Sequence, residues 1–331
     1  APEGTKGISL FAVPKFLVKD DGSIGERNEV HCLSLEEKLG IHASPTAVMS
    51  YGEDKGAVGY LVGEENRGLM HMFTMMNNAR HAVGREGLAI SESAYQLALQ
   101  YAMERKQGNA IGTATQATIV EHSDVKRMLM RMKALTEAMR GLTYTCAYAF
   151  DVAERATDEE ECSRASRRGD LLTPVVKGWC TDNAQIVASL GVQIHGGMGF
   201  VEETGAAQYM RDARILPIYE GTNGIQALDL MGRKTLRDGG QAVSELFEDM
   251  ENTLSRLGQL DLTNIETAFR ESLEHLKEVL DWIKSNAGNN TLCNSAASHY
   301  LELMGITCGG WMLAKSAIVA ADQLAQTSTE M

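Results

Sequence analysis

The sequence predicts a mainly α-helical chain with a partial antiparallel β-domain at its N-terminal end. Only five prolines occur in 331 residues, and residues 46–173 and 218–331 contain none. Because proline costs about 3 kcal/mol inside a helix, both stretches can hold long helices. Apolar residues recur there every three or four positions, whereas the first 65 residues are short apolar runs between turn residues.

The N-terminal segment is expected to form antiparallel strands. Apolar runs cover residues 7–13, 29–33 and 47–51, and turn-forming residues occupy positions 20–23 and 52–56. Strands this few cannot close a sheet by themselves. We therefore expect an incomplete sheet here.

Apolar stripes at helical spacing predict the central bundle. They run over residues 66–106, 125–153, 171–190, 203–214 and 222–236. The intervening residues 155–170 are charged, with Asp158-Glu159-Glu160-Glu161 at their centre, and are predicted to be a solvated loop. The result is a helical bundle over residues 66–238, after a β segment over residues 1–65.

A third segment, residues 239–331, is predicted to be an additional helical domain. It begins after Asp238-Gly239-Gly240, the clearest boundary in the chain. Two amphipathic faces follow, at residues 243–257 and 265–283. A last helical stretch starts near Ser295, and we expect Cys308-Gly309-Gly310 to interrupt it.

Composition narrows the classes of function. The chain carries 31 Lys and Arg against 44 Asp and Glu, a net charge of −13, which disfavours a nucleic-acid partner. No apolar run approaches the length of a membrane span and no leader is visible, so we expect no membrane insertion. Six scattered cysteines without a Cys-x-x-Cys pair indicate reduced thiols in the cytoplasm, and no histidine cluster predicts a metal site.

One unusual segment is the glycine-rich stretch from Gln193 to Phe200. Gly196, Gly197 and Gly199 would let a backbone approach a ligand closely, and their N–H groups can cradle an anion. A plain glycine helix stop explains the same residues equally well.

A second segment places Glu220 between Tyr219 and Gly221. Thr222 can cap the following helix, which contains Gly224. Apolar surroundings disfavour the charged form of a carboxyl group and raise its pKa towards the range of a general base. An ordinary surface glutamate at a helix start remains the alternative.

Two further features allow a functional and a structural interpretation. Arg105, at the end of a long helix, could bind phosphate with two hydrogen bonds, or could simply be stabilised by the helix dipole. Met72, Met75 and Met76 could line an acyl-chain pocket or be adaptable core filler.

Taken together, these segments resemble the acyl-CoA dehydrogenase family over residues 7–237. The motifs are Val192–Gly199 and the run from Arg211 through Thr222. The resemblance corresponds to the later part of the family's β-domain and its C-terminal four-helix domain. The segment after Gly240 is similar to the additional C-terminal domain of a subgroup that includes 3-methylthiopropanoyl-CoA dehydrogenase-like proteins.

The resemblance implies an FAD-dependent oxidoreductase of fatty acid metabolism. Glu220 falls on the base that removes the α-proton of an acyl-CoA thioester, the β-hydrogen leaving as hydride to FAD to give a trans-2-enoyl-CoA. Positions that match FAD contacts, in part from the partner subunit, are Arg105, Gln193, Gly196, Gly197, Thr222 and Gly224. Positions that match substrate contacts are Asn77, Arg80, Tyr219 and Gly221.

The family further implies an acyl-CoA substrate, an electron-transfer flavoprotein as acceptor, and a homo-oligomer, expected to be a dimer. The sequence departs from the usual pattern at Gly108, Asn109 and Asn77. The family's N-terminal helical domain and early β-domain loops are not in these 331 residues, so we expect them alone to bind FAD poorly. A flavin-dependent acyl-CoA oxidase of the same fold and a non-catalytic helical scaffold are the alternatives.

Overall fold

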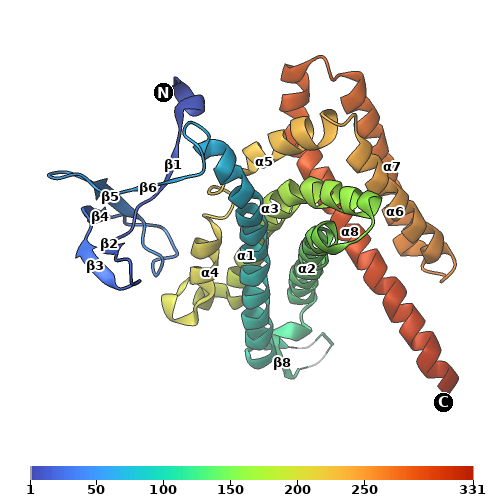
Figure 1. Ribbon diagram of the computed structural model, residues 1–331. Coiled ribbons are helices and arrows are strands. Elements are labelled where there is room, and N and C mark those ends of the chain that lie inside the picture. The colour runs from blue at the N-terminus through green and yellow to red at the C-terminus, as the bar shows by residue number, and fades with distance from the viewer. Residues whose placement is uncertain (1, 110, 113, 331) are drawn as a thin grey trace. The chain divides into compact units, whose positions relative to one another are not determined.

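The computed structural model describes residues 2–109, 111–112 and 114–330, without the side chains of residues 74 and 328–330 (Figure 1). The chain divides into two compact units, which meet in the sequence between Ala79 and Arg80. Each unit is described by itself. The mainly helical fold class predicted from the sequence is confirmed.

The first unit holds three separate antiparallel strand pairs rather than a closed sheet. They are β1 (Leu10–Ala12) with β6 (Tyr60–Val62), β2 (Phe16–Val18) with β3 (Ile24–Arg27), and β4 (Val30–Leu35) with β5 (Ala47–Tyr51), after the 3₁₀ turn η1 (Gly4–Gly7). The buried Asn28 ties segments together, since its amide donates to the carbonyls of Pro14 and Val58 at 2.9 and 2.8 Å. Many apolar strand residues stay exposed, as expected of an incomplete sheet.

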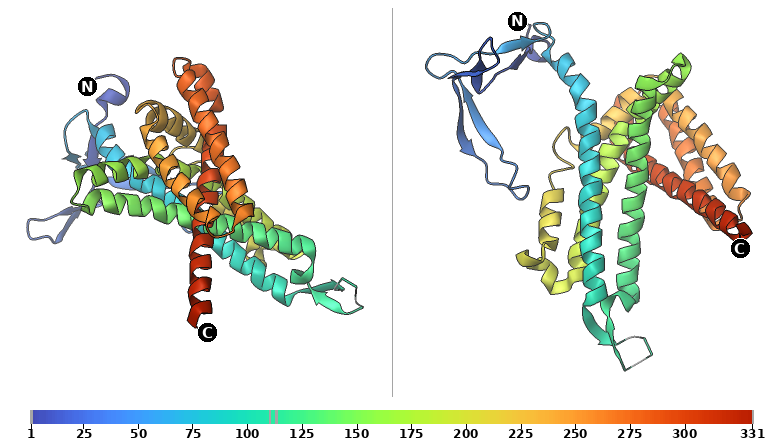
Figure 2. Two further views of the ribbon diagram at one scale, coloured as in Figure 1. Left: turned by 90° about the vertical axis from the view of Figure 1, so that its right-hand side faces the viewer. Right: turned by 60° about the horizontal axis from the view of Figure 1, so that its bottom comes forward.

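Three long helices form the centre of the second unit. They are residues 80–104 of α1 (Gly68–Glu104), α2 (Ser123–Arg155) and α3 (Glu159–His195). A hairpin of β7 (Lys106–Asn109) and β8 (Gln116–Thr118), followed by η2 (Ile119–Glu121), joins α1 to α2 (Figure 2). Glycines allow α1 to approach α3: a Cβ at Gly84 would lie 2.5 Å from Cγ1 of Val176.

The predicted loop over residues 155–170 is wrong, because α3 already begins at Glu159. Asp158 caps this helix by accepting a hydrogen bond from the N–H of Glu161, and acidic residues in a first turn are stabilised by the helix dipole. Next along the helix, Arg164, Arg167 and Arg168 form ion pairs with the acidic residues Glu245, Glu248 and Asp249. The charge run is therefore a capped helix start and an interhelix contact.

Short elements follow α3 and lead to the C-terminal helices. They are η3 (Gly196–Phe200), η4 (Glu202–Thr204), α4 (Ala206–Ala213), α5 (Asn223–Asp229) and the π-helical η5 (Leu230–Leu236). Predicted helices over residues 203–214 and 222–236 are thus present, although each is divided into two pieces.

The last three helices are α6 (Gln241–Gly258), α7 (Thr263–Ser285) and α8 (Asn290–Glu330). The predicted apolar faces of α6 and α7 are buried, apart from Ile265. The predicted break at residues 308–310 is wrong, because α8 is continuous. Its glycines serve packing instead: a Cβ at Gly305 or Gly309 would lie 2.2 or 2.6 Å from Trp179 of α3.

The expectation that no segment has the length and composition of a membrane span needs a correction at helix α8. By length and composition alone, residues 290–327 meet the test for a membrane-spanning helix, a test that the core helix of a soluble protein also passes. Much of this helix consists of small and weakly polar residues. It therefore contains no uninterrupted apolar run, which is the sequence signal on which that expectation was based. Within its most apolar window, 44% of residues are buried inside the protein.

Candidate functional site

The loop from Pro217 to Asn223 carries Glu220 and leads into α5. The N–H of Asn223 donates to the carbonyl of Pro217 at 3.0 Å, which closes the loop. Thr222 caps α5 as predicted, since its Oγ1 accepts from the N–H of Ile225 at 3.4 Å. Glu220 is therefore held at the N-terminal end of a short helix, and its side chain is half-buried.

The backbone at Glu220 is unusual. Its φ of 55° lies in the left-handed region, and Gly221 follows with a φ of 85°. Non-glycine residues in this region cost of order 1–3 kcal/mol and are concentrated at functional sites. A Cβ at position 221 would also lie 2.9 Å from Nε2 of Gln226, so glycine is required there. Gln226 is fully buried and donates to the carbonyls of both Glu220 (3.4 Å) and Gly221 (3.2 Å).

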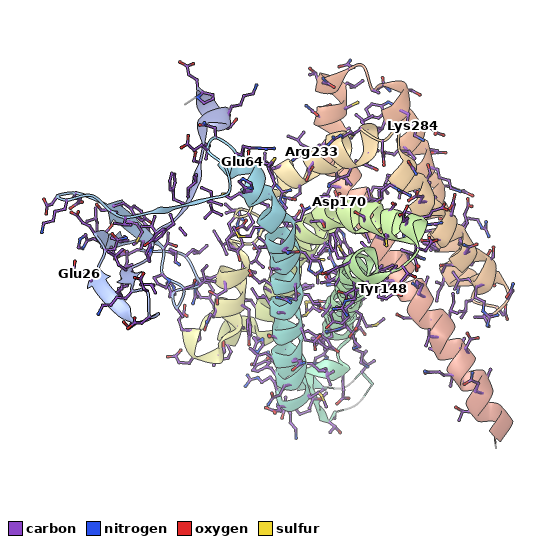
Figure 3. All side chains as sticks on the ribbon, in the orientation of Figure 1. Glu26, Glu64, Tyr148, Asp170, Arg233 and Lys284 are labelled. Carbon is purple, nitrogen blue, oxygen red and sulfur yellow. The ribbon has the colours of Figure 1, made fainter. Side chains whose placement is uncertain are left out.

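A buried charge cluster lies beside this loop. Nη1 of Arg80, on α1, donates to Oδ2 of Asp229 at 3.0 Å, and Nε of Arg233 contacts Oδ1 of the same carboxylate at 2.6 Å. Arg80 and Asp229 are buried, and Arg233 is labelled in Figure 3. Among the described residues, Nε of Arg80 and Oε1 of Gln226 are buried without a hydrogen-bond partner. Unsatisfied buried polar atoms are rare in proteins and need a reason.

Helix α3 adds a second buried cation. Lys177 is completely buried, and its ammonium donates to Oδ1 of Asn223 at 2.9 Å. Burial lowers the pKa of Lys177 to about 8; Arg80 lowers it as well, whereas Asp182 and Glu220 act in the opposite direction. Glu220 thus shares its surroundings with two cations, Arg80 and Lys177.

Tyr219 is oriented by a residue of α1. Its hydroxyl donates to the carboxylate of Glu86. Burial raises the pKa of Tyr219, and the acceptor Glu86 raises it further. The phenol is therefore a neutral hydrogen-bond donor throughout the physiological range.

A cavity of about 500 Å³ opens next to the start of α5. Its lining includes Asn223 and Gly224 together with Asp182 of α3 and His299 and Glu302 of α8. Gly224, a predicted cofactor contact, therefore faces this cavity, and α8 forms one wall.

The predicted phosphate-binding residues lie together at the C-terminal end of α3, whereas the loop meets the middle of this helix. Gly196 ends this helix with a φ of 59°, and a Cβ at Gly196 or Gly197 would have nothing within 4 Å. The buried ring of His195 stacks on Tyr101 with their centroids 4.4 Å apart, which joins the glycine turn to the end of α1. Arg105 and Gln193 are exposed at this end.

The structure thus sorts the predicted residues of the second unit into two groups. One group lies in the loop and at the start of α5, beside Arg80: Tyr219, Glu220, Gly221, Thr222 and Gly224. The other group lies at the glycine turn: Arg105, Gln193, Gly196 and Gly197. Lys177 and His195, which mark the two groups on α3, are about 27 Å apart along the helix. Asn77 belongs to the first unit, and its role stays a prediction.

Sequence reasoning missed Lys177, Asn223 and Gln226. The signal for Lys177 was a single charged residue within the otherwise apolar run from Leu171 to Trp179. Nothing in the sequence indicated that Asn223 would be its partner. Whether Met72, Met75 and Met76 line an acyl-chain pocket stays a prediction. Met75 is 64% exposed, so it is not core filler within the first unit.

Comparison with known proteins identifies the family. Residues 66–235 match the family model "Acyl-CoA dehydrogenase, C-terminal domain", and residues 246–331 match "Acetyl-CoA dehydrogenase C-terminal like". The chain belongs to the acyl-CoA dehydrogenase family. The resemblance inferred from the two motifs is confirmed.

Individual members of the acyl-CoA dehydrogenase family align over nearly the whole chain. A 3-methylmercaptopropionyl-CoA dehydrogenase of Ruegeria pomeroyi is 49% identical over 98% of this chain and 56% of its own length. The structure of Caenorhabditis elegans ACDH-11 in complex with C11-CoA has a TM-score of 0.78 and 24% identity, over 96% of this chain and 51% of the other.

A Bacillus anthracis acyl-CoA dehydrogenase complexed with FAD has a TM-score of 0.69 and 21% identity, over 94% of this chain and 53% of the other. At these identities the two structural matches establish the fold alone. The chain spans about half the length of the relatives that it matches.

Proposed function

We propose that the chain carries the base of an FAD-dependent acyl-CoA dehydrogenase, and that this base is Glu220. One observation carries the proposal: Glu220 sits in a left-handed turn that is held by hydrogen bonds with α5 and α3, with the buried Arg80 beside it. Strain of this kind persists only where the surroundings over-determine it, as they do at catalytic sites. The half-buried carboxylate would remove the α-proton of an acyl-CoA thioester.

The surroundings of Glu220 suit this proton transfer. A carbon next to a thioester is a weak acid, so a carboxylate can deprotonate it only if the developing negative charge is stabilised. Arg80 and Lys177 provide buried positive charge near the loop, whereas the hydroxyl proton of Tyr219 is already donated to Glu86. The residues fix the base and the local field before substrate arrives.

The residues present also fit FAD, which, when bound, would accept the hydride that leaves the β-carbon. Gly196 and Gly197 present backbone to open space, and the exposed Arg105 lies at the same end of the bundle. Against the middle of α3, Gly224 lines a cavity at the capped N-terminus of α5.

The separation of these two groups supports a homodimer. Lys177, beside the loop, and His195, at the glycine turn, are about 27 Å apart along α3 within one chain. We infer that each FAD contacts the α5 end of one copy and the glycine turn of a second copy. An electron-transfer flavoprotein is the expected acceptor of the electrons.

For the substrate, we propose a short acyl-CoA that carries a thioether, because the aligned Ruegeria pomeroyi relative is named for 3-methylmercaptopropionyl-CoA. A panel of straight, branched and methylthio acyl-CoA substrates on the complete FAD-loaded protein tests this. A kcat/KM for the methylthio substrate below that of butyryl-CoA would contradict it. Rapid reoxidation of the reduced protein in air would instead indicate an oxidase.

The base is tested by Glu220→Gln, with Glu203→Gln on the exposed η4 segment as the matched control. Glutamine keeps the size of the side chain but cannot take up a proton. We expect Glu220→Gln to lower kcat by about 10³-fold or more with FAD still bound, and the control to remain within about twofold of wild type. Retained turnover in Glu220→Gln would place the base elsewhere.

A further inference from the structure

The loop that carries Glu220 is fastened to α3 through the side chain of Asn223. Its amide Nδ2 donates to the carbonyl of Gly178 at 3.1 Å, to Oγ1 of Thr181 at 2.9 Å and to Oδ1 of Asp182 at 2.8 Å. Because the backbone N–H of Asn223 also closes the loop onto Pro217, the position of Glu220 depends on how this amide is oriented.

Lys177 fixes that orientation. An asparagine side chain can be turned by 180° to exchange its oxygen and nitrogen, and the groups that face it separate the two arrangements. The acceptors Gly178 and Asp182 favour Nδ2 on their side, and a donor on the opposite side favours Oδ1 there. The Nζ of Lys177 is such a donor at 2.9 Å, and Oγ1 of Thr181 is a weaker one at 3.3 Å. An ammonium cannot accept a hydrogen bond, so it excludes the reversed amide altogether.

The burial of Lys177 also needs a reason. Lysine is almost never fully buried unless it is paired, and no carboxylate forms an ion pair with Lys177 among the described residues. The charged groups that face it are Asp182 on α3 and Glu220 in the loop, which attract it, and Arg80 on α1, which repels it. A buried ammonium with one amide partner is a costly way to hold a fold together.

We propose that Lys177 is a positioning residue for proton abstraction: its ammonium orients Asn223, and Asn223 holds the Pro217–Asn223 loop, and with it Glu220, against α3. This inference rests on the proposed role of Glu220. Lys177 is proposed to touch neither substrate nor cofactor; it acts through Asn223 and through the attraction of its charge for Glu220.

The proposal has a consequence for the pH profile. Burial lowers the pKa of Lys177 to about 8, so the ammonium loses a proton as the pH rises through that value. The neutral amine makes a weaker hydrogen bond and no longer attracts Glu220 and Asp182. We therefore expect kcat of the wild-type protein to fall above about pH 8.

The first test compares Lys177→Met with Thr173→Val, which alters a buried side chain one turn away on α3. In the complete FAD-loaded protein, we expect Lys177→Met to lower kcat about 10- to 100-fold, to leave KM within about twofold, and to lack the alkaline fall in kcat. Thr173→Val should keep the wild-type kcat and pH profile. If both variants have the same kcat and pH profile, the proposal is wrong.

A double-mutant cycle tests whether Lys177 acts through Asn223. We expect Asn223→Ala to lower kcat by a similar factor, and the double variant to be no slower than the slower single variant. Additive losses would contradict the proposal. Because Asn223 is half-buried, Asn223→Ala with its own pH profile keeps the test decisive if Lys177→Met fails to fold.

A third readout needs neither cofactor nor turnover. Hydrogen exchange of peptides that span residues 215–228 should be faster in Lys177→Met and Asn223→Ala than in wild type, and unchanged in Thr173→Val. Unchanged exchange in Lys177→Met would overturn the positioning role. Retained turnover in Glu220→Gln, by contrast, would overturn the proposed function while the exchange result still decides whether Lys177 holds the loop.

Discussion

The molecule contains two glycine turns on which its chemistry is proposed to depend, and their surroundings are opposite. Gly221 lies in a crowded place: an added Cβ would meet Gln226 at 2.9 Å and Arg80 at 3.8 Å. Gly196 and Gly197 lie in the open, since no atom of the described residues comes within 4 Å of an added Cβ. One turn is clamped by the protein itself, whereas the other presents bare backbone to its surroundings.

This difference shows why each glycine is there. At the clamped turn the protein needs glycine to fit its own side chains and a left-handed backbone. At Gly197 the φ lies outside the left-handed region and no neighbour excludes a side chain, so nothing inside the chain requires glycine. The backbone at Gly197 is therefore free to be approached from outside the described chain, which fits the proposed contact with a bound phosphate or a partner subunit.

The largest expected effect is that of Gly221→Ala. Alanine would be strained at a φ of 85° and its Cβ would displace Gln226, which holds the carbonyl of Glu220. We expect kcat to fall about 100-fold and the free energy of unfolding to fall by about 1–3 kcal/mol. Steady-state kinetics and urea unfolding measure the two effects, and a fully active, fully stable variant would show that the turn is not clamped.

A smaller and different effect is expected for Gly197→Ala. With open space at this position, the free energy of unfolding should change by no more than about 0.5 kcal/mol. FAD should bind about tenfold more weakly, which corresponds to 1.4 kcal/mol. Calorimetric titration with FAD checks this expectation, and a loss of stability with unchanged FAD affinity would reverse the contrast between the turns.

The smallest expected effect is the contribution that Lys177, beside the clamped turn, makes to the pH dependence of stability. The folded pKa of Lys177, about 8, is below its ordinary value of 10.5, so between these values the unfolded chain binds more protons than the native chain. This group therefore makes the free energy of unfolding rise with pH across that window. The buried thiols of Cys146, Cys180 and Cys308, whose pKa burial raises, lower the free energy of unfolding of both proteins above about pH 9. In urea unfolding at several pH values, the free energy of wild type minus that of Lys177→Met should therefore rise across the window; a constant difference would refute it.

Local features of the site could be predicted from the sequence. Thr222 before a helical stripe predicted the cap of α5, and the three glycines after His195 predicted the end of α3. Glu220 stood out because its neighbours are uncharged. Each of these signals lies within a few residues of the feature it predicts.

The features that were missed depend on partners far apart in the chain. Lys177 meets Asn223, 46 residues later, and Arg80 meets Asp229, 149 residues later. The helix start at Glu159 could not be predicted, because Arg164 and Arg167 in this charged stretch pair with acidic residues of α6 that lie far along the sequence. The continuity of α8 could not be predicted, because Gly305 and Gly309 pack against the indole ring of Trp179, which is far away in the sequence.

The central claim is that Glu220 removes the proton next to the thioester, and α-deuterium washout tests it most directly. An acyl-CoA deuterated at the α-carbon would be incubated anaerobically in ordinary water with the FAD-loaded protein and no electron acceptor, and deuterium loss followed by mass spectrometry. We predict release by wild type and by Glu203→Gln, and release at least about 10³-fold slower by Glu220→Gln. Equal washout by Glu220→Gln and wild type would contradict the claim.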